Sequence, residues 1–169
     1  MKNMKKIFVL IILFSGIMAS SFAQVTIPAS ATAKIVTPIT INKILDMSFG
    51  NIAVNPTAPG GTVTLPASSP ATRTFTGGIS FPTVTDVVQA AKFTVNGEGT
   101  SAYSIAIPGT ITITSGSNNM TIVPVSNPSG SGALVGGTQD IYVGGTLTVG
   151  ATQPVGVYTG TFNLTVNYN

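Results

Sequence analysis

Apolar and polar side chains alternate along the last part of this 169-residue chain. Between residues 158 and 168, one parity carries Tyr158, Phe162, Leu164, Val166 and Tyr168, and the other carries Thr and Asn. A period of two places successive side chains on opposite faces of a pleated strand. The pattern therefore predicts a half-buried strand over residues 158–168, the clearest strand in the chain.

A second alternation, built from smaller apolar residues, runs from Val25 to Ile35 and continues at Ile39 and Ile41. It predicts another strand near the start of the chain, over residues 25–35. We expect this strand to close an edge of its own sandwich. The alternative is that it leaves its own domain and completes a neighbouring copy by strand addition.

Shorter apolar runs fill the middle of the chain. The candidate strands are residues 63–65, 74–81, 92–95, 103–107, 110–114, 120–125 and 141–149. Clusters of Gly, Pro, Ser and Asn separate them and suit turns. Many short strands with intervening turns predict an all-β fold, an antiparallel β-sandwich, with residues 24–169 as a single domain.

Two local signals concern the connections between these strands. Asn96-Gly97 favours a hairpin between the strand that ends at Val95 and the one that begins at Tyr103. Residues 86–92 suit either one or two helical turns capped by Asp86 or an irregular crossover.

The first 23 residues have the features of a secretory signal peptide. Three lysines in the first six residues precede an apolar run from Ile7 to Ala19. The run is shorter than the roughly 20 residues that a membrane-spanning helix needs. Small residues then indicate cleavage between Ala23 and Gln24. We expect export to the periplasm or to the cell surface and medium, with no membrane span in the mature chain and, without Cys, no lipid anchor.

The net charge of +3 belongs to the signal peptide, because Lys2, Lys5 and Lys6 account for the whole excess. The remaining charges balance. They are Lys34, Lys43, Arg73 and Lys92 against Asp46, Asp86, Glu98 and Asp140. Without a basic patch to neutralise phosphates, no nucleic-acid partner is expected.

The chain has no Cys and no His. A disulfide framework, a zinc site with the usual ligands, and a Ser-His or Cys-His nucleophile pair are all excluded. The four acids of residues 24–169 are far apart in sequence, which disfavours a carboxylate pair for glycoside cleavage. We therefore expect no catalytic residue, no cofactor and no metal site, and predict that the protein is not an enzyme.

Three glycine-containing motifs superficially resemble calcium- or phosphate-binding loops. Residues 96–99 hold one acid, too few for a calcium loop, and are interpreted as a turn. Gly136-Gly137 and Gly144-Gly145 have neither the helix nor the lysine that a phosphate cradle needs. They are interpreted as bends or bulges.

The tyrosines admit two interpretations. Their rings could stack on sugars, which leaves a glycan as a possible ligand, or cap the core with the hydroxyls directed outward. We favour the core interpretation. The residues concerned are Tyr103, Tyr142, Tyr158 and Tyr168.

Sequence motifs at both ends resemble a known family. Residues 33–41 (AKIVTPITI) and 45–52 (LDMSFGNI), then 143–149 (VGGTLTV) and 156–168 (GVYTGTFNLTVNY), resemble the DUF4402 family of exported bacterial proteins. The ending is also similar to spore coat protein U and to fimbrial, or pilus adhesin, subunits. The resemblance implies an immunoglobulin-like sandwich of the pilin/adhesin type, in a family of undefined activity. The chain departs from fimbrial subunits in lacking a disulfide.

These observations lead to two functional hypotheses. The first is an exported, non-enzymatic structural or adhesive surface protein, such as a fimbria-like subunit that associates with itself or with other surface proteins by strand addition. The alternative is a monomeric β-sandwich module that binds a carbohydrate or another ligand.

Overall fold

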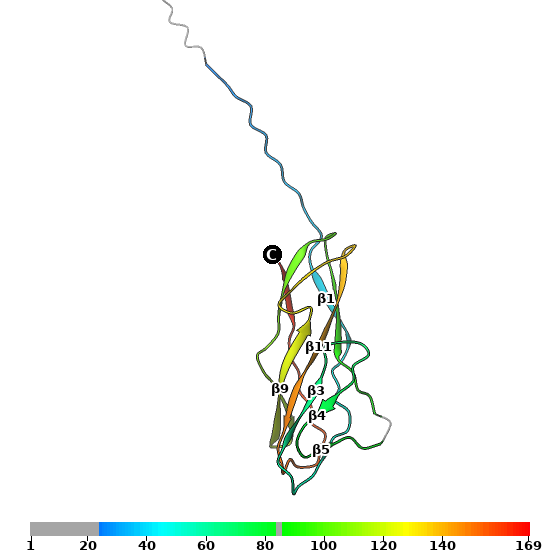
Figure 1. Cartoon of the computed structure of the whole chain (residues 1–169). Coiled ribbons are helices and arrows are strands. Elements are labelled where there is room, and N and C mark those ends of the chain that lie inside the picture. The colour runs from blue at the N-terminus through cyan, green and yellow to red at the C-terminus, as the bar shows by residue number, and fades with distance from the viewer. Residues whose placement is uncertain (1–23, 84–85) are drawn as a thin grey trace, which may run out of the picture. The chain divides into compact units, whose positions relative to one another are not determined.

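The computed structural model describes residues 24–83 and 86–169 (Figure 1). The chain divides between Lys34 and Ile35 into two units, which are described separately. In the first unit, residues 24–34 are extended and form no strand. Val25 and Ile27 are 82% and 85% exposed. The strand predicted from Val25 to Ile35 is therefore wrong for this chain. A strand needs a partner for its backbone, and none of the described strands pairs with residues 24–34.

The described part of residues 35–169 contains strands and no helix. The strands are β1 (Thr40–Leu45), β2 (Ala53–Val54), β3 (Gly61–Leu65), β4 (Thr74–Phe75), β5 (Ile79–Ser80), β6 (Ala91–Asn96), β7 (Ala102–Ala106), β8 (Ile111–Ser115), β9 (Asn118–Asn127), β10 (Ser131–Ala133), β11 (Thr138–Val149) and β12 (Thr165–Tyr168). All pairs are antiparallel. The fold is all-β, as predicted.

Strand β11 is the centre of a seven-stranded sheet. Its first half, 138–143, pairs with β6, and 145–149 pairs with β3. Residues 142–148 pair with β9, whose other neighbour is β8. Residues 142–143 pair with both β6 and β9, and residues 145–148 pair with both β3 and β9. Strands β6 and β3 therefore lie along one edge of β11, and β9 lies along the opposite edge.

Gly144 lies where β11 changes partners. Val143 is the last residue paired with β6, and Gly145 is the first paired with β3. A Cβ on Gly144 would lie 2.2 Å from the carbonyl oxygen of Leu65. Glycine is required here because a neighbouring backbone approaches closely. The Gly136-Gly137 pair instead forms the two-residue turn between Val135 and Thr138, with φ of 61° and 84°. Positive φ at both positions is typical of a type I′ turn.

A three-stranded sheet, β10-β7-β12, faces part of the larger one, and β2 pairs with β5. The hairpin predicted at Asn96-Gly97 is wrong, because β6 and β7 belong to different sheets. Both edges of β6 are already paired, with β1 and with β11. The turn therefore carries the chain from one sheet to the other.

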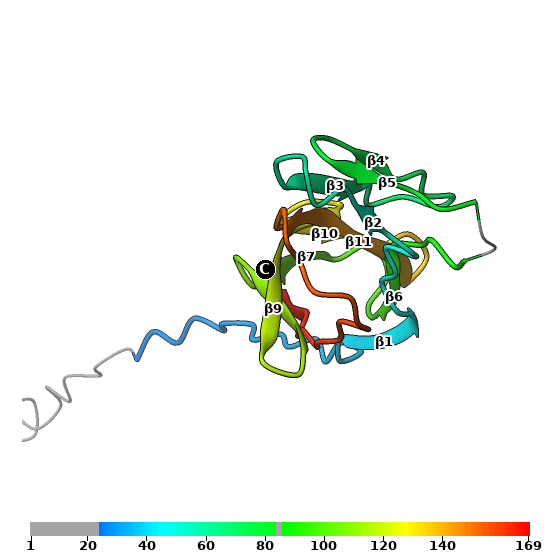
Figure 2. The same ribbon diagram turned by 90° about the horizontal axis from the view of Figure 1, so that it is seen from below.

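Two clusters of buried side chains form the core. The first contains Phe49, Val63, Leu65, Ile79, Ile111, Ile122, Leu147 and Val149. The second contains Ala91, Phe93, Val95, Tyr103, Ile105, Leu134, Ile141 and Val143. Phe162 packs against both. Viewed along the strands of this unit, the larger sheet curls so that β1 and β9 lie on either side of the chain that follows β11 (Figure 2). The arrangement is sandwich-like.

The strand predicted over residues 158–168 is shorter than expected. Only Thr165–Tyr168 forms β12, but the alternation in burial extends back to Phe162 as predicted. The helix considered over residues 86–92 does not form in its described residues. Ser48 and Gln89 instead exchange two backbone hydrogen bonds of 2.9 and 3.0 Å, and β6 begins at Ala91.

Candidate functional site

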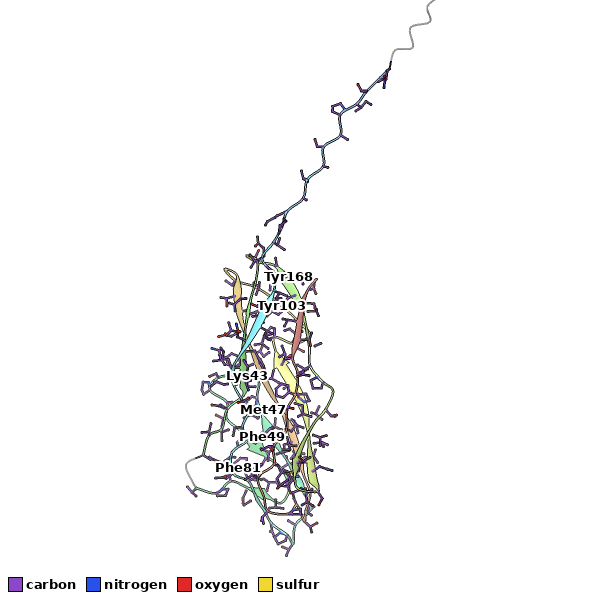
Figure 3. The ribbon with its side chains drawn as sticks, turned by 180° about the vertical axis from the view of Figure 1, so that it is seen from behind. Lys43, Met47, Phe49, Phe81, Tyr103 and Tyr168 are labelled. Carbon is purple, nitrogen blue, oxygen red and sulfur yellow. The ribbon has the colours of Figure 1, made fainter. Side chains whose placement is uncertain are left out.

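A cavity of about 960 Å³ lies within residues 35–169, between the inner face of the large sheet and two covering segments. These are residues 46–54, which end in the short strand β2, and the irregular residues 153–162. Most side chains on its sheet side are apolar. They include Phe93, Ile111, Ile113, Ile122, Leu147 and Val149. Met47, Phe49 and Phe162 line it from the covering segments. Figure 3 shows Met47 and Phe49 next to one another along the unit.

The cavity exists because residues 153–162 cover the core without joining a sheet. Their one ladder contact is between Thr159 and Thr114, with backbone hydrogen bonds of 2.8 and 3.0 Å. Pro154 cannot donate to a ladder, and Val155 and Val157 are exposed. A strand that covered this region fully would bury such side chains.

Two edge strands lie next to the second core cluster. Strand β1 ends the seven-stranded sheet, and β12 ends the three-stranded one. Ile39 and Ile41 at β1, and Leu164 and Val166 at β12, pack against this cluster while remaining half-buried. Each strand offers the unpaired backbone groups of an edge, together with apolar side chains that are incompletely covered.

A tyrosine connects the start of β1 to the end of β12. The Tyr168 hydroxyl donates to the carbonyl oxygen of Thr37 at 2.8 Å and accepts from the Glu98 backbone N–H at 2.7 Å. The Glu98 carboxylate accepts from the N–H and hydroxyl of Thr37, at 3.3 and 3.2 Å. Figure 3 places Tyr168 near Tyr103, at one end of this unit. These contacts fix the relative positions of β1 and β12 there.

A part-buried ion pair lies at the rim of the cavity. The Arg73 side chain is 9% exposed, lies 3.1 Å from the Asp86 carboxylate and stacks 3.9 Å from the Phe81 ring centre. Its guanidinium also donates to the carbonyl oxygens of Phe49 and Asn51. Asp86, which the sequence analysis considers as a helix cap, caps no helix and instead binds Arg73. It and Arg73 join three loops, which is a structural role.

The other charged side chains are also partnered. Asp140 pairs with Lys92 at 2.7 Å and accepts from the Thr94 hydroxyl at 2.7 Å. The Lys92 hydrogen bond and then the Thr94 hydroxyl lower the pKa of Asp140, while Asp140 raises the pKa of Lys92. Lys43 pairs with Asp46 at 2.7 Å. Among the described residues, no group of three or more His, Cys, Asp or Glu side chains could hold a metal ion.

The tyrosines are placed mainly as core and bracing residues. Tyr103 is fully buried and its hydroxyl donates to Gln139 at 2.6 Å, and burial raises its pKa. Tyr158 donates to the Pro154 carbonyl oxygen at 2.8 Å. The core interpretation is confirmed for Tyr103, although its hydroxyl reaches a side-chain partner inside the protein.

The predicted signal peptide and Ala23 lie outside the described residues, so the cleavage site between Ala23 and Gln24 stays a prediction. Where the chain is described, no helix has the length and apolar character needed to cross a membrane.

These features define an antiparallel, all-β, sandwich-like domain with an apolar cavity beneath an irregular cover. The family described as "domain of unknown function (DUF4402)" matches residues 39–168. The chain belongs to this family, which confirms the resemblance to DUF4402 and covers the motifs from residue 39 to residue 168. No match was found among curated proteins, and none among solved structures.

The cavity was not predicted from the sequence patterns. A signal for it was present, because Pro154, Gly156 and Gly160 interrupt the last part of the chain just before the alternation that forms β12. A Cβ on Gly160 would lie 2.4 Å from the carbonyl oxygen of Thr112. At this glycine the backbone lies close to β8, but the residues that follow form no strand paired with β8.

Proposed function

We propose that this protein is an exported, non-enzymatic structural or adhesive surface protein whose copies associate by strand addition, as a fimbria-like subunit would. One observation carries the proposal. Edge strands β1 and β12 both place half-buried apolar side chains on the same core cluster. An added strand would satisfy their backbone groups and cover these side chains.

The segment before β1 is suited to be the added strand. Val25, Ile27 and Ile35 share one parity with three alanines between them, and the apolar ends are exposed. An extended segment that adds to a sheet edge gains main-chain hydrogen bonds, and its alternate side chains enter pockets along the groove. The small central residues would pass over the core without steric conflict, and the larger ends would give the contact its register.

Deletion of residues 24–34 from the mature protein tests this step. Full-length protein should form ladders that resist mild detergent, and the deletion variant should remain monomeric by light scattering. A peptide of residues 24–35 should bind the deletion variant. A control peptide with Val25→Asp and Ile27→Asp, which keeps the backbone donors and removes the apolar ends, should not bind.

Strictly monomeric full-length protein at high concentration and on intact cells would refute strand addition. The surface location has a separate test. Cell fractionation should place the protein in the periplasm or at the cell surface, and N-terminal sequencing should give Gln24 as the first residue.

The cavity supports a second candidate, a monomeric ligand-binding module. Its sheet side is lined by aliphatic and aromatic side chains, so it favours an apolar ligand over a free sugar. Native mass spectrometry of protein purified from its own cells would support this candidate if it showed a bound small molecule. Leu147→Trp, which fills the cavity from β11, should then abolish that species, whereas the surface change Thr148→Ser should leave it intact.

A further inference from the structure

Threonines cover the outward face of five adjacent strands, in the order β4-β3-β11-β9-β8. In one row across the strands, Thr74 pairs with Thr64, Thr64 with Thr146, and Thr146 with Val123. In the next row, Thr62 pairs with Thr148, Thr148 with Thr121, and Thr121 with Thr112. We call this set, together with Thr76 beside Thr62, the threonine face.

The threonine face is ordered and open to solvent. The hydroxyls of Thr62 and Thr76 lie 2.8 Å apart, and those of Thr64 and Thr146 lie 3.3 Å apart. Thr62 and Thr146 are half-buried, and the other threonines of the face are exposed. Strand geometry repeats these side chains about every 4.8 Å across the sheet and about every 7 Å along it. The result is a regular array of methyl and hydroxyl groups.

The same face carries no charge. Strands β3, β4, β8 and β9 contain no charged residue, and the one charge of β11, Asp140, lies in the half that pairs with β6. Cross-strand threonine pairs stabilise a sheet, which accounts for threonine at these positions. They do not account for the missing Lys and Glu, because exposed sheets ordinarily carry such residues to prevent association. An uncharged face of this kind suits an uncharged partner.

The size of the face argues against a second copy as that partner. Two rows across five strands cover about 300 Å². A stable protein interface needs about 800 Å² on each partner. A small contact can still give tight binding when many linked copies bind one repeating surface, because the avidity of the assembly far exceeds the affinity of each contact. An assembly of surface subunits would supply those copies.

We propose that the threonine face binds neutral polysaccharide, presented as an extended surface with repeating hydroxyl groups. Each threonine hydroxyl both donates and accepts, as a sugar hydroxyl does, and each methyl group can contact the apolar face of a sugar ring. The inference rests on the proposed role at the cell surface and names the material to which that surface adheres.

The test uses beads coated with the full mature protein, so the required multivalency does not depend on strand addition. The beads are mixed with microcrystalline cellulose or starch granules as neutral polymers, and with alginate gel as a charged one. Wild-type beads should bind at least one neutral polymer, and alginate poorly. Thr121→Lys/Thr148→Lys, which puts two charges at the centre of the face, should reduce binding at least about tenfold.

A matched control, Thr83→Lys/Thr100→Lys, adds the same charge at exposed positions outside the face and should bind as wild type does. Thermal melts establish that each variant is folded. If the central lysines prevent folding, Thr121→Val/Thr148→Val removes two hydroxyls with little change in shape, and it should weaken binding in the same direction.

Failure of wild-type beads to bind either neutral polymer would overturn the inference, and so would binding that is unaffected by the central variants. Self-association of wild-type protein that the central lysines abolish, without polymer binding, would instead assign the face to contacts between copies. That outcome would overturn the polysaccharide inference and leave strand addition to its own test.

Discussion

The hydroxyl of Tyr168 accepts a hydrogen bond from the backbone N–H of Glu98 at 2.7 Å, across 70 residues of sequence. The same hydroxyl donates to the carbonyl oxygen of Thr37. One side chain therefore satisfies two backbone groups and connects the beginning, the middle and the end of the sandwich-like unit.

Tyr168→Phe should lower the free energy of unfolding by about 1 to 2 kcal/mol, because it removes the partner of the part-buried Glu98 N–H and of the exposed Thr37 carbonyl oxygen. The ring and its packing remain, so Tyr168→Ala should cost more. Denaturant unfolding of the two variants and wild type measures both effects. Identical stability of Tyr168→Phe and wild type would mean that water replaces the hydroxyl at no cost.

Phe162→Ala should destabilise the protein by about 3 kcal/mol, since its ring packs against both core clusters and lies 6.1 Å from the ring of Phe93. The neighbouring side chains point outward, so Thr161→Ala and Asn163→Ala should each cost under about 1 kcal/mol. Urea melts of the three variants decide the matter. Equal losses would contradict the inward assignment of Phe162.

Gly144→Ala should destabilise by at least about 2 kcal/mol, because the added methyl group meets the backbone of residues 65–67 and nothing flexible can move aside. Gly109 provides the control. No atom lies within 4 Å of a Cβ built there, so Gly109→Ala should change stability by less than about 0.5 kcal/mol. The comparison separates close backbone approach from the general effect of replacing glycine.

The ion pair of Lys92 with Asp140 predicts a pH dependence with a definite sign. Because the pKa of Asp140 is lowered in the folded state, its contribution is present above the unfolded pKa and is lost as pH falls through the folded one. Asp140→Asn should flatten the decline in stability below about pH 4. The effect should be small, since the pair is partly exposed, and should shrink further in high salt. An unchanged acid limb in Asp140→Asn would show that the pair does not contribute.

Alternation of side chains predicted most of the sheet correctly. Segments such as 92–95, 120–125 and 141–149 lie in strands because their apolar parity matches the pleat of a sheet with one covered face. The same rule failed for Val25–Ile35, because a period of two specifies the faces of a strand but supplies no partner for its backbone. Whether a segment pairs depends on whether the fold presents a free sheet edge beside it, which the segment's own sequence does not specify.

The candidate site could be predicted far less well. The cavity depends on how residues 153–162 cross the core. The position of β12 depends on its pairing with the distant strand β7 and on the contact of Tyr168 with Thr37. The threonine face arises because threonines from five separate segments align in register, as Thr62, Thr148 and Thr121 do. Local sequence carries little information about register between distant strands.

The position of β11 in the chain determines when the fold can form. Strands β3, β6 and β9 all pair with it, and both core clusters include its side chains, such as Val143 and Leu147. A chain made from its N-terminus therefore gains its central strand only after residue 138, when most of the sequence has already emerged. Long-range pairing of this kind folds slowly, and unpaired strands remain accessible meanwhile. The sheet therefore cannot close until synthesis has nearly finished. Until then, a binding factor or a second copy can reach strand edges that the finished fold covers.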